Sequence, residues 1–110
     1  MKIYISGGIT GVPRPFYHYK FSVAEDRLKA RGHQVINPVR QNEPLNMQEF
    51  SYEDNMHLCY AYIDICDAIY MLEGWENSKG ARAEHEYAIN SAKQLIYESV
   101  ERGKHGVQTI

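Results

Sequence analysis

Residues 74–84 combine a polar loop, a helix start and a carboxylate, and this combination is typical of a small-molecule site. The loop follows the apolar run Ala68–Leu72; Ser78 stands at the mouth of the next helical pattern, and Glu84 comes six residues later. In open α/β sheets, ligands bind beyond the carboxyl ends of the strands. A helix N-terminus at that edge favours anions such as phosphate. The segment therefore predicts a small-molecule site at the end of this strand.

Glu84 is the residue of this segment that could carry out chemistry. On a helical wheel it lies at the edge of an apolar stripe made by Ala81, His85, Ala88 and Ala92. A carboxylate in a cleft can attack the anomeric carbon of a sugar as a nucleophile. The alternative is an exposed first-turn glutamate that interacts favourably with the helix dipole. The residues alone leave both interpretations open.

The side chains near this carboxylate each have a structural as well as a ligand-binding interpretation. Ser78 can cap the helix, contact a phosphate, or do both, and Gly80 belongs to the same helix start. Trp75 can stack on a base or cover the core. Lys79 and Arg82 can meet a phosphate, although solvated first-turn cations are the simpler interpretation.

A second motif, Ser6-Gly7-Gly8-Ile9-Thr10-Gly11, follows the first apolar run of the chain. Glycines let backbone N–H groups approach a phosphate or sugar closely. The spacing matches neither the dinucleotide fingerprint nor a P-loop. The alternative is a tight turn from a strand into a loop, which is the commonest use of glycine.

Composition and charge limit the classes of partner. The chain has 110 residues, 44% of them hydrophobic, and a formal net charge of −2 with both signs scattered. This predicts one domain, with no nucleic-acid patch and no basic membrane face. No apolar run approaches a membrane span, and the apolar N-terminal stretch is too short for a signal peptide. We therefore expect a cytoplasmic protein.

The cysteines and histidines do not form a metal-binding pattern, and we expect neither a metal nor a cofactor. Cys59 and Cys66 lie seven residues apart on one face of a helical pattern, too far apart for a disulfide. We expect both thiols to be reduced and mostly buried. The five histidines show no ligand spacing, and His85 is expected to be a core histidine.

Strand and helix patterns alternate four times along the chain. The order predicts a parallel sheet with helices on both faces, and it brings the loops after the first and third strands to one cleft. Residues 39–49 are polar and irregular, and they form either an ordered lid or a surface excursion. The expected strands are 2–6, 33–36, 68–72 and 94–98; the expected helices are 16–31, 51–66, with a capping box at its start, and 79–92.

These motifs together resemble the nucleoside 2-deoxyribosyltransferase-like superfamily, and within it a small uncharacterised bacterial and phage family related to deoxynucleotide N-hydrolases. The resemblance covers residues 2–98, which we expect to form the domain, whereas 99–110 form a tail that could reach a neighbouring subunit. It rests on several blocks in order: Lys2–Gly7 with Ile9–Gly11, Gly32–Pro38, Cys66–Leu72, Gly74-Trp75, Ser78–Ala81 and Glu84–Ala88. It implies a flavodoxin/Rossmann-like three-layer sandwich with a parallel sheet of four or five strands.

The resemblance also implies roles for individual residues. The superfamily's glutamate nucleophile falls on Glu84, and the tyrosine beside it falls on Tyr4. The serine that helps the related hydrolases to bind a 5′-phosphate falls on Ser78. Their phosphate-binding loop corresponds to Gly7, Gly8, Ile9 and Thr10.

One position departs from the superfamily's pattern. The aspartate that assists the departing base falls on Cys59, and a thiol, with a pKa of about 8.5, is a poor substitute for a carboxyl group. General-acid assistance is typically worth about 10²–10⁴-fold in rate. Asp64 is near in sequence but is turned away on the helical wheel.

Two functions follow as hypotheses. The first is a nucleotide N-glycosidase or deoxyribosyltransferase in which Glu84 attacks C1′, Tyr4 orients Glu84, and Ser78 and Gly80 with residues 7–10 hold a phosphate. The second is a non-catalytic protein that binds a nucleotide or an ADP-ribose-like signal in the same pocket. A third possibility is an assembly module with a vestigial pocket. In each case the resemblance implies a homo-oligomer, because relatives assemble as dimers or larger complexes.

Overall fold

The computed structural model describes residues 1–101 and confirms the predicted α/β class. Its sheet is entirely parallel, with the strand order β2-β1-β3-β4. The strand order changes direction between β1 and β3, so the carboxyl ends of these two strands form the switch point at which open α/β sheets bind ligands. The strands are β1 (Lys2–Ser6), β2 (Gln34–Ile36), β3 (Ala68–Met71) and β4 (Gln94–Tyr97).

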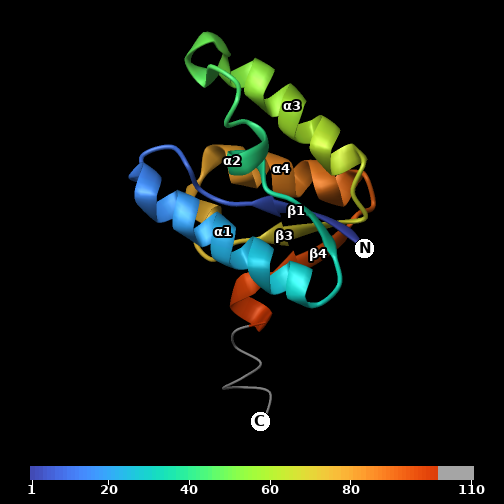
Figure 1. Cartoon of the computed structure of the whole chain (residues 1–110). Coiled ribbons are helices and arrows are strands. Elements are labelled where there is room, and N and C mark those ends of the chain that lie inside the picture. The colour runs from blue at the N-terminus through green and yellow to red at the C-terminus, as the bar shows by residue number, and fades with distance from the viewer. Residues whose placement is uncertain (102–110) are drawn as a thin grey trace.

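Helices cover both faces of this sheet and give the expected flavodoxin/Rossmann-like three-layer arrangement (Figure 1). The helix α1 packs on one face, and α3 and α4 pack on the other. The α-helices are α1 (Arg14–Ala30), α2 (Pro38–Gln41), α3 (Tyr52–Asp64) and α4 (Lys79–Asn90), and two 3-10 turns are η1 (Met47–Glu49) and η2 (Trp75–Asn77).

Strand β1 divides its side chains between the two layers, because successive residues of a strand point to opposite faces. Ile3 and Ile5 belong to the core beneath α1. Tyr4 lies in the opposite core with residues of α3 and α4, and Ser6, two residues further on, shares that face. This alternation is what brings two hydroxyl groups of the central strand against α4.

The ends of two helices follow the sequence signals. Ser51 and Asp54 form the predicted capping box, in which each side chain accepts a hydrogen bond from the other residue's backbone N–H. The chain leaves α1 through Gly32, whose φ of 89° is accessible mainly to glycine. Cys59 in α3 and Cys66 just after it are buried free thiols, as expected.

Prolines explain why two segments are helical in the structure although the sequence did not predict them to be so. The helix α1 begins at Arg14 rather than Phe16, since Pro15 fits the first helical turn, where no N–H donor is needed. In the same way Pro38 opens α2, so residues 39–49 are not wholly irregular. Asn37 caps α2 by accepting hydrogen bonds from the N–H groups of Val39 and Arg40.

The predicted stripe of α4 needs correction at Glu84 and at Ala92. The residues of α4 that are buried are Ala81, Glu84 and Ala88, so Glu84 lies within the stripe and not at its edge. Ala92 is exposed, because α4 ends at Asn90 and Ala92 takes a φ of 58° in the turn that follows. The helical wheel assumed one continuous helix to residue 92. Because α4 ends at Asn90, Ala92 lies outside the helix and is not part of its buried stripe.

A buried carboxylate ties α1 to α2. Glu25, 2% exposed, accepts a hydrogen bond of 3.1 Å from Asn37 Nδ2 and forms ion pairs with Lys29 and Arg40. Burial raises the pKa of Glu25, but the hydrogen bonds from Lys29, Asn37 and Arg40 outweigh burial and hold it below its ordinary value. The cluster fixes the start of α2, and with it the segment that leads into residues 42–50.

The end of the described chain folds back on α1. Residues 98–101 form a short helical turn after β4, and Glu101 accepts hydrogen bonds of 3.0 and 3.1 Å from Arg31 Nη1. The rest of the predicted tail, residues 102–110, lies outside the described residues. Within residues 1–101 no helix has the length and apolarity that crossing a membrane requires.

Candidate active site

Glu84 is the centre of the candidate site. Its side chain is 7% exposed and projects from the second turn of α4 towards the end of β1. Tyr4 donates a hydrogen bond of 3.1 Å to Glu84 Oε2, and Ser6 Oγ donates one of 2.5 Å to Oε1. Each carboxylate oxygen is therefore held by one hydroxyl group of the central strand.

The protonation of Glu84 reflects two opposing influences. Burial raises the pKa of its carboxyl group, and the hydrogen bonds from Ser6, Cys59 and Tyr4 lower it in part. Burial and the charge of Glu84 together raise the pKa of Tyr4 well above its ordinary value, so Tyr4 stays a hydrogen-bond donor. The site thus holds a carboxylate whose pKa is above the usual range for glutamate.

Cys59 reaches the same site from α3. It is buried, and burial together with the charge of Glu84 raises the pKa of its thiol to about 12. A thiol with that pKa keeps its proton at neutral pH and gives it up less readily than a carboxyl group would. Cys59 is consequently a neutral donor beside Glu84.

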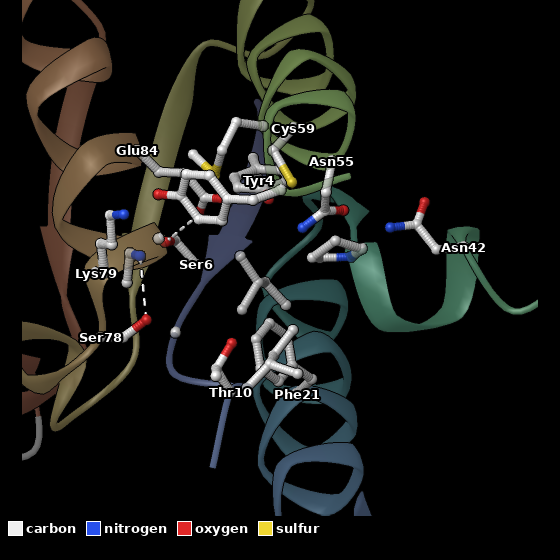
Figure 2. A pocket seen from close by; sticks show the side chains of 18 of the residues that line it. Tyr4, Ser6, Thr10, Phe21, Asn42, Asn55, Cys59, Ser78, Lys79 and Glu84 are labelled. Atoms are coloured by element: carbon white, nitrogen blue, oxygen red, sulfur yellow. Dashed lines mark hydrogen bonds between the residues drawn. The ribbon is translucent and has the colours of Figure 1, made fainter. Parts of the chain in front are cut away.

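A cavity of about 400 Å³ opens in front of Glu84, and Figure 2 shows how its lining side chains converge from separate elements. The volume lies within the usual range for small-molecule pockets. The polar lining residues are Tyr4, Ser6, Thr10, Asn42, Tyr52, Asn55, Cys59, Asn77, Ser78, Lys79 and Glu84. The cavity lies at the sheet's switch point, between the loops after β1 and β3 that were predicted to share a cleft.

One end of the cavity is formed by the two glycine-containing loops. Gly7 and Thr10 come from the loop after β1, and Ser78 and Gly80 come from the start of α4. Ser78 caps α4 by accepting a hydrogen bond of 3.2 Å from the Ala81 N–H. A Cβ atom at Gly7 would lie 2.8 Å from Leu72 Cδ1, so this turn requires glycine. The predicted meeting of these two loops is confirmed.

Two of the predicted ligand-binding residues do not line the cavity. Gly8 is not among the lining residues, and a Cβ added there would stand 3.5 Å from the Cβ of Ser78. Trp75 stacks on His85, with ring centroids 4.2 Å apart, and packs against the core formed with α4. The indole occupies the position expected of a residue that covers the core.

The basic residues next to Glu84 have partners of their own. His85 Nε2 lies 2.7 Å from the hydroxyl oxygen of Tyr97, and burial lowers the pKa of this imidazole. Arg82 donates a hydrogen bond of 2.7 Å to the carbonyl oxygen of Glu76. Lys79 Nζ lies over the ring of Tyr52 at 4.6 Å, at the edge of the cavity. Of these three basic residues, Lys79 is the one that lines the cavity.

Sequence reasoning gave no role to several polar residues that line the cavity, among them Ser6, Asn42, Tyr52 and Asn55. The place of Ser6 could have been predicted, since a residue two positions after Tyr4 in a strand points to the same face. The places of Asn42, Tyr52 and Asn55 could not, because their approach to the cavity depends on the path of residues 42–51. Among residues 1–101 no group of three or more His, Cys, Asp or Glu side chains is arranged to hold a metal ion.

Comparison with known families adds one match. The model of the domain of unknown function DUF4406 matches residues 1–97. The chain belongs to the DUF4406 family. The DUF4406 match spans all four strands, α4 and every residue that lines the cavity. No curated protein matches the sequence significantly.

Proposed function

We propose that the protein is an N-glycosidase or deoxyribosyltransferase that acts on a (deoxy)nucleoside 5′-phosphate, with Glu84 as the nucleophile. The observation that carries this proposal is the Glu84 carboxylate at the wall of the cavity, with each oxygen held by a hydroxyl group of β1. Fixing both oxygens limits rotation of the carboxylate and favours a geometry close to that of attack. An exposed first-turn glutamate would have neither the burial nor these partners.

The reaction is a double displacement at C1′. An oxygen of Glu84 forms a bond to C1′ as the C1′–N bond breaks, and the base leaves with the electron pair and takes a proton from water. A water molecule, or the nitrogen of a second base, then attacks C1′ and releases the Glu84 carboxylate. Two inversions give overall retention of configuration, as in retaining glycosidases.

The end of the cavity formed by the loop after β1 and the start of α4 favours a substrate that carries a phosphate. The N-terminus of α4 carries partial positive charge, and Ser78 with Gly80 forms its first residues. The loop after β1 contributes Gly7 and Thr10 to the same end, and Lys79 stands beside it. A nucleoside 5′-phosphate would place its anion there and its sugar in front of Glu84.

Cys59 favours a second candidate function, a protein that binds such a nucleotide, or an ADP-ribose-like signal, without cleaving it. The thiol occupies a position beside Glu84 from which a general acid could assist the departing base, yet its pKa of about 12 makes it a weak acid. Loss of general-acid assistance costs about 10²–10⁴-fold in rate. Slow or absent turnover with tight binding would fit this alternative.

A chromatographic assay separates the two functions. Wild-type protein, Glu84→Gln and the control Glu86→Gln, an exposed glutamate on the same helix, would be incubated with deoxynucleosides, their 5′-monophosphates, NAD and cyclic ADP-ribose species. Release of free base by wild type and Glu86→Gln, but not by Glu84→Gln, supports the glycosidase. Intact ligands that raise the melting temperature support the binding protein. Intact ligands without any such shift contradict both.

A further inference from the structure

A second cavity adjoins the one in front of Glu84. It has a volume of about 450 Å³ and shares four lining residues with the first: Ile9, Pro38, Asn42 and Asn55. A single nucleotide accounts for the first cavity, whose volume is at the small end of the usual range for ligand pockets. The two together form one longer cleft, so the site can hold a ligand larger than a nucleotide.

The position of the second cavity relative to Glu84 identifies which part of the ligand it would take. Ser78 and Lys79 lie on one side of the first cavity, and Asn42 and Asn55 lie across from them (Figure 2). On the proposed function, the phosphate lies at Ser78 and C1′ lies at Glu84. The base attached to C1′ then points towards Asn42 and Asn55, which is where the second cavity begins.

Two of the residues shared by the cavities, Pro38 and Asn42, are held in place by the fold. Pro38 is buried at the start of α2, and the cap of α2, Asn37, is held by Glu25. Asn42 Oδ1 accepts a hydrogen bond of 2.9 Å from the hydroxyl group of Tyr62, which leaves the side-chain NH₂ group of Asn42 as the donor that it can offer to a base. The Asn42 side chain is therefore already held in place where the two cavities meet.

The second cavity offers mainly apolar contact. Tyr17, Val39, Leu45 and Met47 contribute to its lining. Its charged residues pair with one another, since Arg14 Nη2 lies 3.7 Å from Glu43 Oε1. An apolar group entering this cavity would replace water against carbon and sulfur atoms, which is favourable in proportion to the area buried.

From this arrangement, and resting on the proposed function, we infer that the substrate is a nucleotide whose base carries an apolar substituent on the edge remote from the glycosidic bond. The base lies at Asn42 and Asn55, and the substituent occupies the second cavity against Met47 and Leu45. The leaving group in the reaction is then the enlarged base. The bonds that form and break are those given above.

Two matched pairs of nucleotides test the inference: dAMP with N6-benzyl-dAMP, and dCMP with N4-benzyl-dCMP. For each we would measure base release by chromatography and the dissociation constant by calorimetry. We expect the benzylated member of at least one pair to have a kcat/KM about tenfold higher, because burying a few apolar carbon atoms gives a gain of this order. Met47→Trp, which fills the second cavity, should lower that preference at least about fivefold, and Met47→Leu should preserve it.

The outcomes separate this inference from the proposed function. Base release that is equal or faster for both unsubstituted nucleotides overturns the inference and leaves the glycosidase in place. If no nucleotide loses its base, the glycosidase is wrong and the dissociation constants decide the inference. Tenfold tighter binding of a benzylated nucleotide, reduced by Met47→Trp, supports it, and equal or undetectable binding of both members of each pair overturns it.

Discussion

Ser6 Oγ lies 2.5 Å from Glu84 Oε1, so the last residue of β1 donates a hydrogen bond directly to the candidate nucleophile. Ser6 is 1% exposed, and water has little access to this contact. A hydrogen bond to an ionised carboxylate is stronger than one between neutral groups, and burial strengthens it further. Ser6 is thereby a positioning residue for Glu84, together with Tyr4.

The first prediction concerns this contact. Ser6→Ala removes the donor to Oε1, which favours the protonated form of Glu84 and frees the carboxylate to rotate. A hydrogen bond to a charged group is worth about 1.5–3 kcal/mol, so we expect kcat to fall about tenfold to a hundredfold. The pH at which activity reaches half its maximum should rise. Ser99→Ala, at an exposed position, is the control and should match wild type. An unchanged pH profile in Ser6→Ala would contradict the role.

The second prediction is that Glu84→Gln stabilises the fold while it abolishes base release. Burial penalises the charged form of Glu84, and glutamine keeps the shape without the charge. Tyr4 and Ser6 can still bond to the amide, because hydroxyl groups both donate and accept. We expect a gain of about 0.5–2 kcal/mol, or a few degrees in melting temperature, by scanning calorimetry. A lower melting temperature would mean that the charge stabilises the site.

The third prediction concerns pH. The folded-state pKa of Glu84 is raised, so its contribution to stability is fully present below its unfolded pKa and is lost as pH rises through the folded pKa. The stability difference between Glu84→Gln and wild type should therefore be small in acid and grow towards neutral pH. Base release needs the carboxylate and should rise over the same pH interval. Thermal unfolding and initial rates across pH 3–8, a window of about five units around the ordinary value, test both.

The fourth prediction concerns the buried cluster between α1 and α2. Asn37→Asp keeps the cap of α2 but places a second carboxylate against Glu25, in a site where Asn37 is 3% exposed. Like charges at this distance repel, and we expect a loss of about 2 kcal/mol in urea unfolding at neutral pH, recovered in acid as one carboxyl group protonates. Asn46→Asp is the matched control, since Asn46 caps η1 from an exposed position. A loss of equal size in the control would contradict the explanation.

How much of the molecule the sequence predicts depends on whether a feature is local. The alternation of strands and helices along the chain, the capping box at Ser51 and the meeting of the Gly7 and Ser78 loops follow from periodicity, turn residues and the geometry of parallel sheets, and the structure confirms all three. Glu84 could be named as a candidate because a carboxylate near an apolar stripe at a helix start is unusual. Its depth of burial could not, since that depends on how α4 packs against Tyr4 and Ser6 of β1.

Features that depend on long-range packing were not predictable from the residues alone. The bond from Ser6 to Glu84 joins positions 78 residues apart, and it needs both the register of β1 and the angle of α4. Asn42 lines the cavity from the end of α2 and Asn55 from α3, so both depend on how these helices pack beside β1. From the sequence, Glu25 would be expected to be a solvated helix residue, and its burial follows from contacts with Asn37 and Arg40 that only the structure shows. In each case the deciding neighbour comes from another element.

The fifth prediction tests whether Cys59 limits the chemistry. Cys59→Asp puts a carboxyl group beside Glu84, whose charge and buried surroundings raise the pKa of the new group and keep part of it protonated near neutral pH. A protonated carboxyl group transfers its proton to a departing base more readily than a thiol with a pKa of about 12, so base release should rise about tenfold to a hundredfold. Cys59→Ser, a neutral group of similar size, is the control and should give no gain. If Cys59→Asp folds, binds the nucleotide and still releases base no faster than wild type, proton delivery is not what limits this site, and the case for a binding protein based on Cys59 loses its support.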